Sequence, residues 1–298
     1  DDPSKGYAVE SVAEIDELTL ADLVPIIEAS MRSQESATDE LLEGVNTKAA
    51  SHLYRDASNR MTGFCAASPY RGDWDCKPGC SACCSQSVPV TAVEALTVAD
   101  FLRANVPPQE LSDVRIRLQQ NAERYATCSL QQLNDTRHRC ALLDEDRNCS
   151  VHPARPLRCQ GFHSFCAADC EATFQSDGDA APPVDPQTTV AMRGIQSGLS
   201  GALRKRGKDG QYYELNSAVL RAIETPNATE RWERGEDIFA GCTQPVAIPD
   251  DLWIAPQDDG SVVKLCRREN RRTGPEIEVV HITPPTATAE MKSRSRRS

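Results

Sequence analysis

The stretch Cys76-Lys-Pro-Gly-Cys80-Ser-Ala-Cys83-Cys84 places four cysteines within nine residues. Thiols packed this densely between Pro and Gly are typical of a metal or cluster site, because short turns let successive sulfurs face one point. Backbone N–H groups in such turns can also hydrogen-bond the sulfurs and offset thiolate charge. We therefore expect residues 63–87 to be a loop shaped by what it binds.

A second cysteine-bearing stretch without apolar periodicity follows at residues 136–174. Its cysteines are Cys140, Cys149, Cys159, Cys166 and Cys170. Helices are predicted between the two stretches, near 91–105 and 109–127, and Thr91-Ala-Val-Glu94 forms a capping box at the start of the first. Such a helical hairpin can return the chain so that the two cysteine loops meet. Metal binding would then be coupled to folding.

The rest of the chain has a mainly helical pattern. Apolar residues recur near a 3.6 spacing over 11–62, where we expect Pro25 in the first turn of its helix. Further helical stretches lie near 187–206, 211–224 and 228–240. We therefore predict a mainly α fold: irregular cysteine-rich metal-binding loops bridged by a helical hairpin, with helical extensions and little strand.

Changes in composition predict four regions. An N-terminal helical extension (1–62) precedes a cysteine-cluster core (63–175), which binds the metal. C-terminal helices (176–242) follow a polar linker, and residues 243–298 carry Pro, charge and short β-like runs that indicate a loosely structured tail.

Composition excludes some classes of partner. The 298-residue chain has a net charge of −11 and a pI near 5.0, which argues against binding to nucleic acid. No apolar run approaches the roughly 20 residues of a membrane span. An unknown protein partner stays open. We expect a cytoplasmic protein, with a removed N-terminal targeting segment left open because the first residue is Asp.

Thirteen cysteines are compatible with disulfides or with metal. Disulfide frameworks usually hold short secreted chains together, whereas this chain is long and its cysteine count is odd. A bridge between the adjacent Cys83 and Cys84 would strain the peptide between them. Metal is therefore the favoured interpretation, and the two adjacent thiolates can serve one cluster or point to two sites.

The spacing of the first loop, C-x3-C-x2-C-C, favours iron over zinc. Zinc usually takes paired C-x2-C knuckles, whereas a [4Fe–4S] cluster commonly takes three close cysteines and one distant cysteine. We favour a [4Fe–4S] iron–sulfur cluster, with zinc as the alternative. Radical S-adenosylmethionine enzymes share the C-x3-C-x2-C spacing, but helices rather than alternating strands follow it here.

Both loops together resemble the YkgJ-type, or CxxCxxCC, family of zinc- or iron-chelating proteins. The resemblance covers residues 70–175. It rests on Cys76, Cys80, Cys83, Cys84, Cys140, Cys149, Arg155, Pro156 and Cys159, followed by Gly161-Phe-His-Ser164 and Cys170. Read with this resemblance, the two loops predict eight metal ligands: Cys76, Cys80, Cys83, Cys84, Cys140, Cys149, Cys159 and Cys170.

The chain departs from the family pattern at three positions. His152 stands where Tyr is common, Gln160 stands where Arg is common, and Cys166 is an additional thiol. Whether Cys166 or His152 is a ligand therefore stays open. Arg155 and Arg158 are expected either to offset thiolate charge or to be solvated surface groups.

The sequence predicts a metal-binding protein in which the centre has a structural or redox role. The alternatives are a metal-dependent enzyme of peptide or protein modification, and a metal carrier or assembly partner. One branch that the chain resembles is the flagellin lysine methylase, in which such a cysteine domain accompanies methyl transfer to protein lysines. No pattern here indicates an S-adenosylmethionine pocket. Catalytic residues are not identified, and whether the chain is an enzyme is left open.

Overall fold

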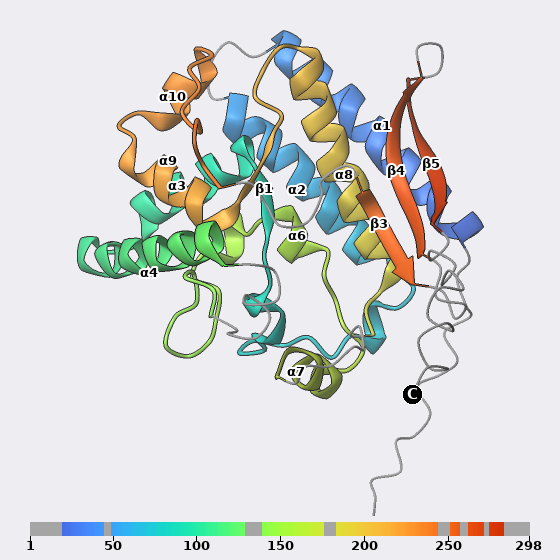
Figure 1. Ribbon diagram of the computed structural model, residues 1–298, viewed down its shortest axis with the longest axis horizontal. Helices are drawn as coiled ribbons and strands as arrows, with labels where there is room; N and C mark the ends of the chain where they lie inside the picture. Colours follow the sequence, from blue (N-terminus) through green and yellow to red (C-terminus); the bar gives the residue numbers. More distant parts are fainter. Residues whose placement is uncertain are drawn as a thin grey trace, which may run out of the picture.

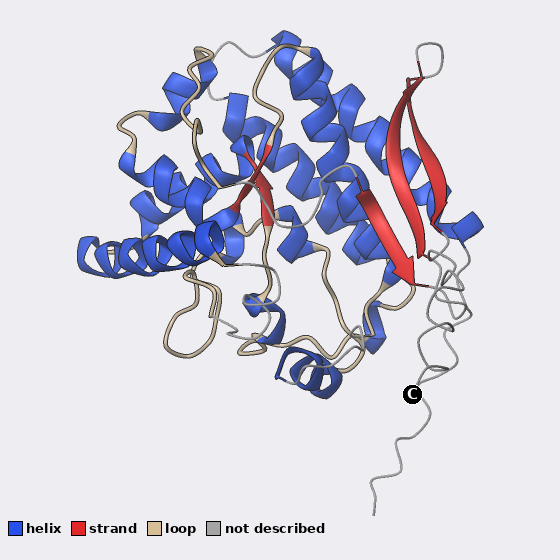
Figure 2. Cartoon of the chain, in the orientation of Figure 1, coloured by secondary structure: helices blue, strands red, loops and turns tan. Residues whose placement is uncertain are grey.

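The protein is mostly helical with little strand, as predicted (Figures 1 and 2). The computed structural model describes residues 20–44, 49–128, 139–175, 183–243, 251–256, 262–270 and 274–282. The main helices are α1 (Leu20–Gly44), α2 (Ala49–Ala67), α3 (Ala92–Asn105), α4 (Pro108–Thr127), α6 (Leu157–Gln160), α7 (Ala167–Gln175), α8 (Pro186–Lys205), α9 (Leu215–Glu224) and α10 (Ala228–Glu233).

Helices α1 and α8 lie side by side over most of their length (Figure 1). They approach at two glycines of α8, where an added Cβ atom would meet the backbone of α1: 2.7 Å from the Ile27 oxygen at Gly194 and 2.3 Å from the Met31 oxygen at Gly198. Ion pairs from Arg206 to Asp39 (2.8 Å) and Glu43 (2.6 Å) hold the ends of the pair together.

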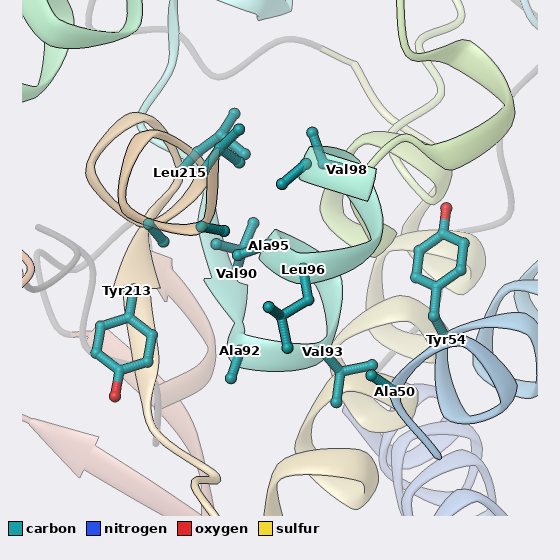
Figure 3. Packing of buried hydrophobic residues seen from close by; sticks show 14 of the residues in the cluster. Ala50, Tyr54, Val90, Ala92, Val93, Ala95, Leu96, Val98, Tyr213 and Leu215 are labelled. Carbon is teal, nitrogen blue, oxygen red and sulfur yellow. The ribbon is translucent and has the colours of Figure 1, made fainter. Parts of the chain in front are cut away.

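One hydrophobic cluster joins α2, α3, α8 and α9 (Figure 3). Leu53 and Met61 of α2 are fully buried, as are Leu102 of α3 and Leu199 of α8. The strands β1 (Pro89–Thr91) and β2 (Tyr212–Glu214) pair antiparallel beside this cluster. The predicted capping box is confirmed: the Thr91 side chain accepts from the Glu94 N–H, and Glu94 accepts from the Thr91 N–H at 2.8 Å.

Three strands after residue 250 form an antiparallel sheet: β3 (Asp251–Pro256), β4 (Val262–Asn270) and β5 (Gly274–Ile282). The sheet lies beside α1 and α8 (Figure 1). Its strands extend the short β-like runs seen in the sequence, while the loose packing predicted for residues 243–298 stays a prediction.

The element boundaries differ from the predictions in several places. Helix α10 ends at Glu233, before the predicted residue 240, and the second cysteine stretch contains the short helices α6 and α7. Helix α2 continues to Ala67, so the irregular loop begins later than residue 63. Pro25 lies inside α1 rather than in its first turn, because α1 already begins at Leu20. Residues Tyr212–Glu214, expected in a helix, form a strand because β1 pairs with them.

Residues 1–19 and 283–298, which belong to the predicted extension and tail, lie outside the described residues. The division into four regions stays a prediction. Within the described ranges, every helix is too short or too polar to cross a lipid bilayer.

Candidate metal centre

The first cysteine loop leaves α2 and turns tightly around Gly79, whose φ of +83° favours glycine. The Cys80 N–H donates to the Lys77 carbonyl at 3.0 Å and closes this turn. Cys83 and Cys84 follow on the short 3-10 helix η2 (Ala82–Ser85), and their thiols hydrogen-bond each other. The loop therefore presents several sulfurs from consecutive turns.

The second loop contains a tight turn between Leu143 and Cys149, which form an isolated antiparallel bridge. The sulfur of Cys140 accepts a hydrogen bond from the Leu142 N–H, and that of Cys149 accepts one from the Val151 N–H. Such bonds stabilise a thiolate, and they are common around metal-bound cysteines.

The two loops meet, as the sequence predicts. The Cys140 N–H donates to the Cys84 carbonyl at 3.0 Å, which joins residues far apart in the chain. Cys159, on α6, interacts electrostatically with Cys140, Cys149 and Cys83. These contacts bring thiols of both loops into one neighbourhood.

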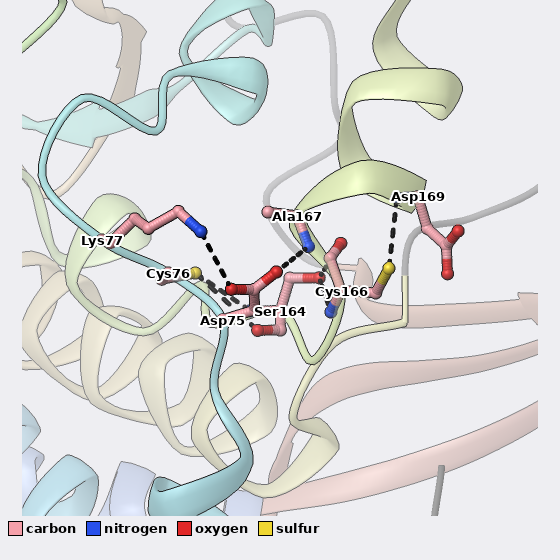
Figure 4. Close-up of polar contacts among 7 residues, drawn as sticks. All are labelled: Asp75, Cys76, Lys77, Ser164, Cys166, Ala167 and Asp169. Atoms are coloured by element: carbon pink, nitrogen blue, oxygen red, sulfur yellow. Dashed lines mark hydrogen bonds and ion pairs between the residues drawn. The ribbon is translucent and has the colours of Figure 1, made fainter. Parts of the chain in front are cut away.

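A second group of hydrogen bonds connects the start of the first loop to the segment before α7 (Figure 4). The Asp75 N–H donates to the Ser164 carbonyl at 2.9 Å, and the Ser164 N–H donates to the Cys76 sulfur at 3.3 Å. The Ala167 N–H donates to the Asp75 carboxylate at 2.9 Å, which lowers the pKa of Asp75, helped by Lys77. Cys170, buried on α7, interacts electrostatically with Cys76, Cys83 and Cys80.

Burial and neighbouring thiols oppose charge on the sulfurs. Burial raises the pKa of Cys140 to about 12, and it raises the pKa of Cys159 strongly. The hydrogen bond from Cys84, together with burial, raises the pKa of Cys83. The nearby Arg155 works in the opposite direction on Cys159 and Cys83. A bound cation would strengthen that effect, because metal ligands must lose their protons.

The described thiols of the candidate site are suitable ligands for a thiophilic metal, but they do not yet lie close enough together to bind one. None of the cysteines whose side chains are described forms a disulfide. In the part of the chain that the structure describes, no three Cys, His, Asp or Glu side chains are already close enough to hold an ion. Binding would therefore have to draw the thiols closer together.

His152 and Cys166, whose role as ligands the sequence left open, lie at the edge of the cysteine site. His152 is exposed, and burial of part of its ring lowers its pKa, with Arg155 adding to the effect. The Cys166 sulfur accepts from the Asp169 N–H at 3.4 Å and points away from Cys76 (Figure 4). Among the described residues, no hydrogen bond brings either side chain to another thiol, and their ligand role stays undecided.

The two arginines differ. The Arg155 charge acts on several thiols. Arg158 is half-buried and donates to the Gln196 side chain at 2.9 Å, and burial lowers the pKa of Arg158. Gln160, which replaces a common Arg, is buried and donates to the Arg155 carbonyl at 2.8 Å and the Tyr54 hydroxyl at 3.2 Å.

The sequence did not predict the part played by Glu94 and Gln160. The capping box identified Glu94 as a helix cap, but its carboxylate also accepts from the Leu157 N–H at 2.8 Å. That bond positions α6, which bears Cys159. Periodicity gives no signal for it, because the partners lie 63 residues apart.

A cavity of about 400 Å³ lies between α2, α3 and Pro153-Ala154. Tyr54, in its wall, donates to the Arg155 carbonyl at 2.8 Å. A neighbouring cavity of about 520 Å³ shares Ser51 and Asp100 with it. Neither of these two cavities is lined by a cysteine.

Comparison with known proteins supports the metal interpretation. Residues 75–177 match the model of the CxxCxxCC family, described as "Putative zinc- or iron-chelating domain". The match covers about a third of the chain and contains all the predicted ligands. No curated protein and no solved structure matches the chain. The family match supports zinc or iron chelation by this part of the chain.

Proposed function

We propose that the two cysteine loops together hold an iron–sulfur cluster, with zinc as the alternative metal, in a structural or redox role. The observation that carries this proposal is the hydrogen bond from the Cys140 N–H to the Cys84 carbonyl, which brings the two loops together. A metal bound across this junction would fasten together two segments separated by α3 and α4. A cytoplasmic location belongs to the proposal, because a reducing compartment keeps thiols free to bind metal.

The chain's own residues prepare such a site. Leu142 and Val151 direct N–H groups at two sulfurs, and Arg155 supplies positive charge beside Cys159. When bound, an iron–sulfur cluster would supply one-electron redox chemistry, and zinc would supply a cross-link only. The C-x3-C-x2-C-C spacing supports iron.

The test is anaerobic purification of the full chain, followed by elemental analysis, sulfide determination and a visible spectrum. The proposal expects iron and acid-labile sulfide in equal amounts, with charge-transfer absorption that bleaches on reduction. A colourless protein with stoichiometric zinc would eliminate the cluster but keep the metal site. A folded, metal-free protein with disulfides would eliminate both.

An enzyme of peptide or protein modification is the second candidate. The 400 Å³ cavity favours it, because the cavity wall contacts the backbone of Arg155 beside the thiols. A substrate bound there would still not touch sulfur, since no cysteine lines that cavity. A structural or redox centre is therefore the better supported function.

A further inference from the structure

We propose that the cysteines form two metal centres rather than one. An inner centre would use Cys140, Cys149 and Cys159, and an outer centre would use Cys76, Cys80 and Cys170. One of the adjacent pair, Cys83 or Cys84, would complete each set. This inference rests on the proposed function and adds to it the number of centres and their ligands.

The two sets belong to different backbone frameworks. The inner set lies on the turn that contains the Leu143–Cys149 bridge and on α6, which Glu94 holds through the Leu157 N–H. The outer set lies on the turn closed by Cys80 and on α7, which the Asp75 carboxylate holds at the Ala167 N–H (Figure 4). Each framework fixes its own thiols.

The neighbours of each thiol show the same division. Cys140 and Cys149 interact electrostatically with the Cys159 thiol. Cys76 and Cys80 interact in the same way with the Cys170 thiol. Of the outer thiols, none is among the strongest influences on Cys159.

The adjacent pair stands at the junction. Cys83 influences thiols of both sets, and the Cys84 carbonyl accepts from the Cys140 N–H. Because Cys83 and Cys84 are adjacent on η2, where the two frameworks meet, the pair can supply one sulfur to each side. Each set then contains four thiols, which is the number that a closed zinc site or a [4Fe–4S] cluster requires.

The two sets differ in access to solvent at one thiol. Cys76 of the outer set is exposed, whereas Cys140, Cys149 and Cys159 of the inner set are half-buried. The outer centre should therefore lose its metal to a chelator before the inner centre does.

The test measures metal and sulfide per chain in the anaerobically purified full-length protein. We expect two centres: two zinc ions, two clusters, or one of each. The double variant Cys76→Ser/Cys170→Ser should keep one centre and the far-UV spectrum of the wild type. The matched double variant Cys128→Ser/Cys242→Ser changes a half-buried and a buried thiol outside both sets and should keep two.

Three results would overturn the inference. If the wild type holds one centre, the inference is wrong and the proposed function stands. If the folded wild type holds no metal, both the inference and the proposed function are wrong. An outer double variant that keeps two centres removes the ligand assignment. If that variant does not fold, the release of metal from the wild type to a chelator decides: two phases support the inference, and a single phase contradicts it.

Discussion

At the scale of single residues, the buried carboxylate of Glu94 does the most to position the site. It accepts from the N–H groups of Thr91 and Leu157, both at 2.8 Å, and from the Gln196 side chain at 3.0 Å. One side chain thus joins the start of α3, the start of α6 and the middle of α8. Through α6 it fixes the position of Cys159.

We predict that Glu94→Gln lowers the free energy of unfolding by about 3 kcal/mol, because an amide group would face N–H donors that need an acceptor. Urea unfolding followed by circular dichroism measures the change. Glu123→Gln, at an exposed position on α4, is the control and should change stability by less than about 0.5 kcal/mol. Equal effects of the two variants would contradict the role given to Glu94.

His163 is a second residue with a measurable consequence. Its ring stacks on Trp74, with centroids 3.8 Å apart and planes at 13°. Burial lowers the pKa of His163 from 6.5 to about 4, and Arg155 adds to this effect. The unfolded chain therefore binds a proton between about pH 6.5 and pH 4 that the folded protein does not. In that window, stability falls as the pH falls.

We predict that His163→Phe, which keeps an aromatic ring against Trp74, removes this part of the pH dependence. The difference in unfolding free energy between wild type and variant should change by on the order of 3 kcal/mol between pH 7 and pH 4. Denaturant unfolding of the wild type and the variant at both pH values gives the four unfolding free energies that the comparison needs. A difference that does not vary with pH would show that His163 titrates normally.

At the scale of elements, the close approach of α1 and α8 determines the packing on one side of the molecule. An added Cβ at Gly198 would lie 2.3 Å from the Met31 oxygen and 2.9 Å from the Gln34 Cβ. Backbone atoms cannot move aside as a flexible side chain can, so the helices themselves would have to separate.

We predict that Gly198→Ala lowers the unfolding free energy by about 2 kcal/mol or more. The control is Gly63→Ala on α2, where an added Cβ meets nothing within 4 Å. Because Ala is the better helix former, the control should be neutral or stabilising by up to about 1 kcal/mol. Thermal unfolding of both variants measures the contrast, and a stable Gly198→Ala protein would contradict the close packing.

Local patterns predicted much of this level of structure. The Thr91–Glu94 capping box and the spacing of apolar residues gave α3 and α4, and the Pro- and Gly-containing runs gave the cysteine loops. Features that depend on distant partners were not predicted. Tyr212–Glu214 becomes a strand only because β1 lies beside it, and the ladder of β3 to β5 needs three segments at once.

The candidate site likewise has features that the sequence predicted and features that it did not. Cysteine spacing and the family resemblance identify thiols that the fold brings near one another, such as Cys84 and Cys140. The supports of those thiols were not predicted, because Glu94, Gln160 and Asp75 act through contacts with residues far away in the chain. A sequence pattern identifies metal ligands more readily than the hydrogen bonds that position those ligands.

At the scale of the whole molecule, the proposed centre is the link between the two cysteine segments, while the hydrophobic cluster holds the surrounding helices. We predict that a chelator, added with a thiol reductant, lowers the unfolding free energy of the cysteine segments by on the order of 5 kcal/mol or more. Hydrogen exchange should increase in residues 75–84 and 140–170, and much less in α1 and α8. Uniform protection before and after chelation would contradict this division.

X-ray absorption at the edge of the bound metal, measured on the full chain, tests the central claim most directly. The claim that cysteines of both loops hold the metal predicts a first shell of sulfur, at about 2.3 Å if the metal is zinc. A first shell of nitrogen or oxygen, at about 2.0–2.2 Å for zinc, would contradict it.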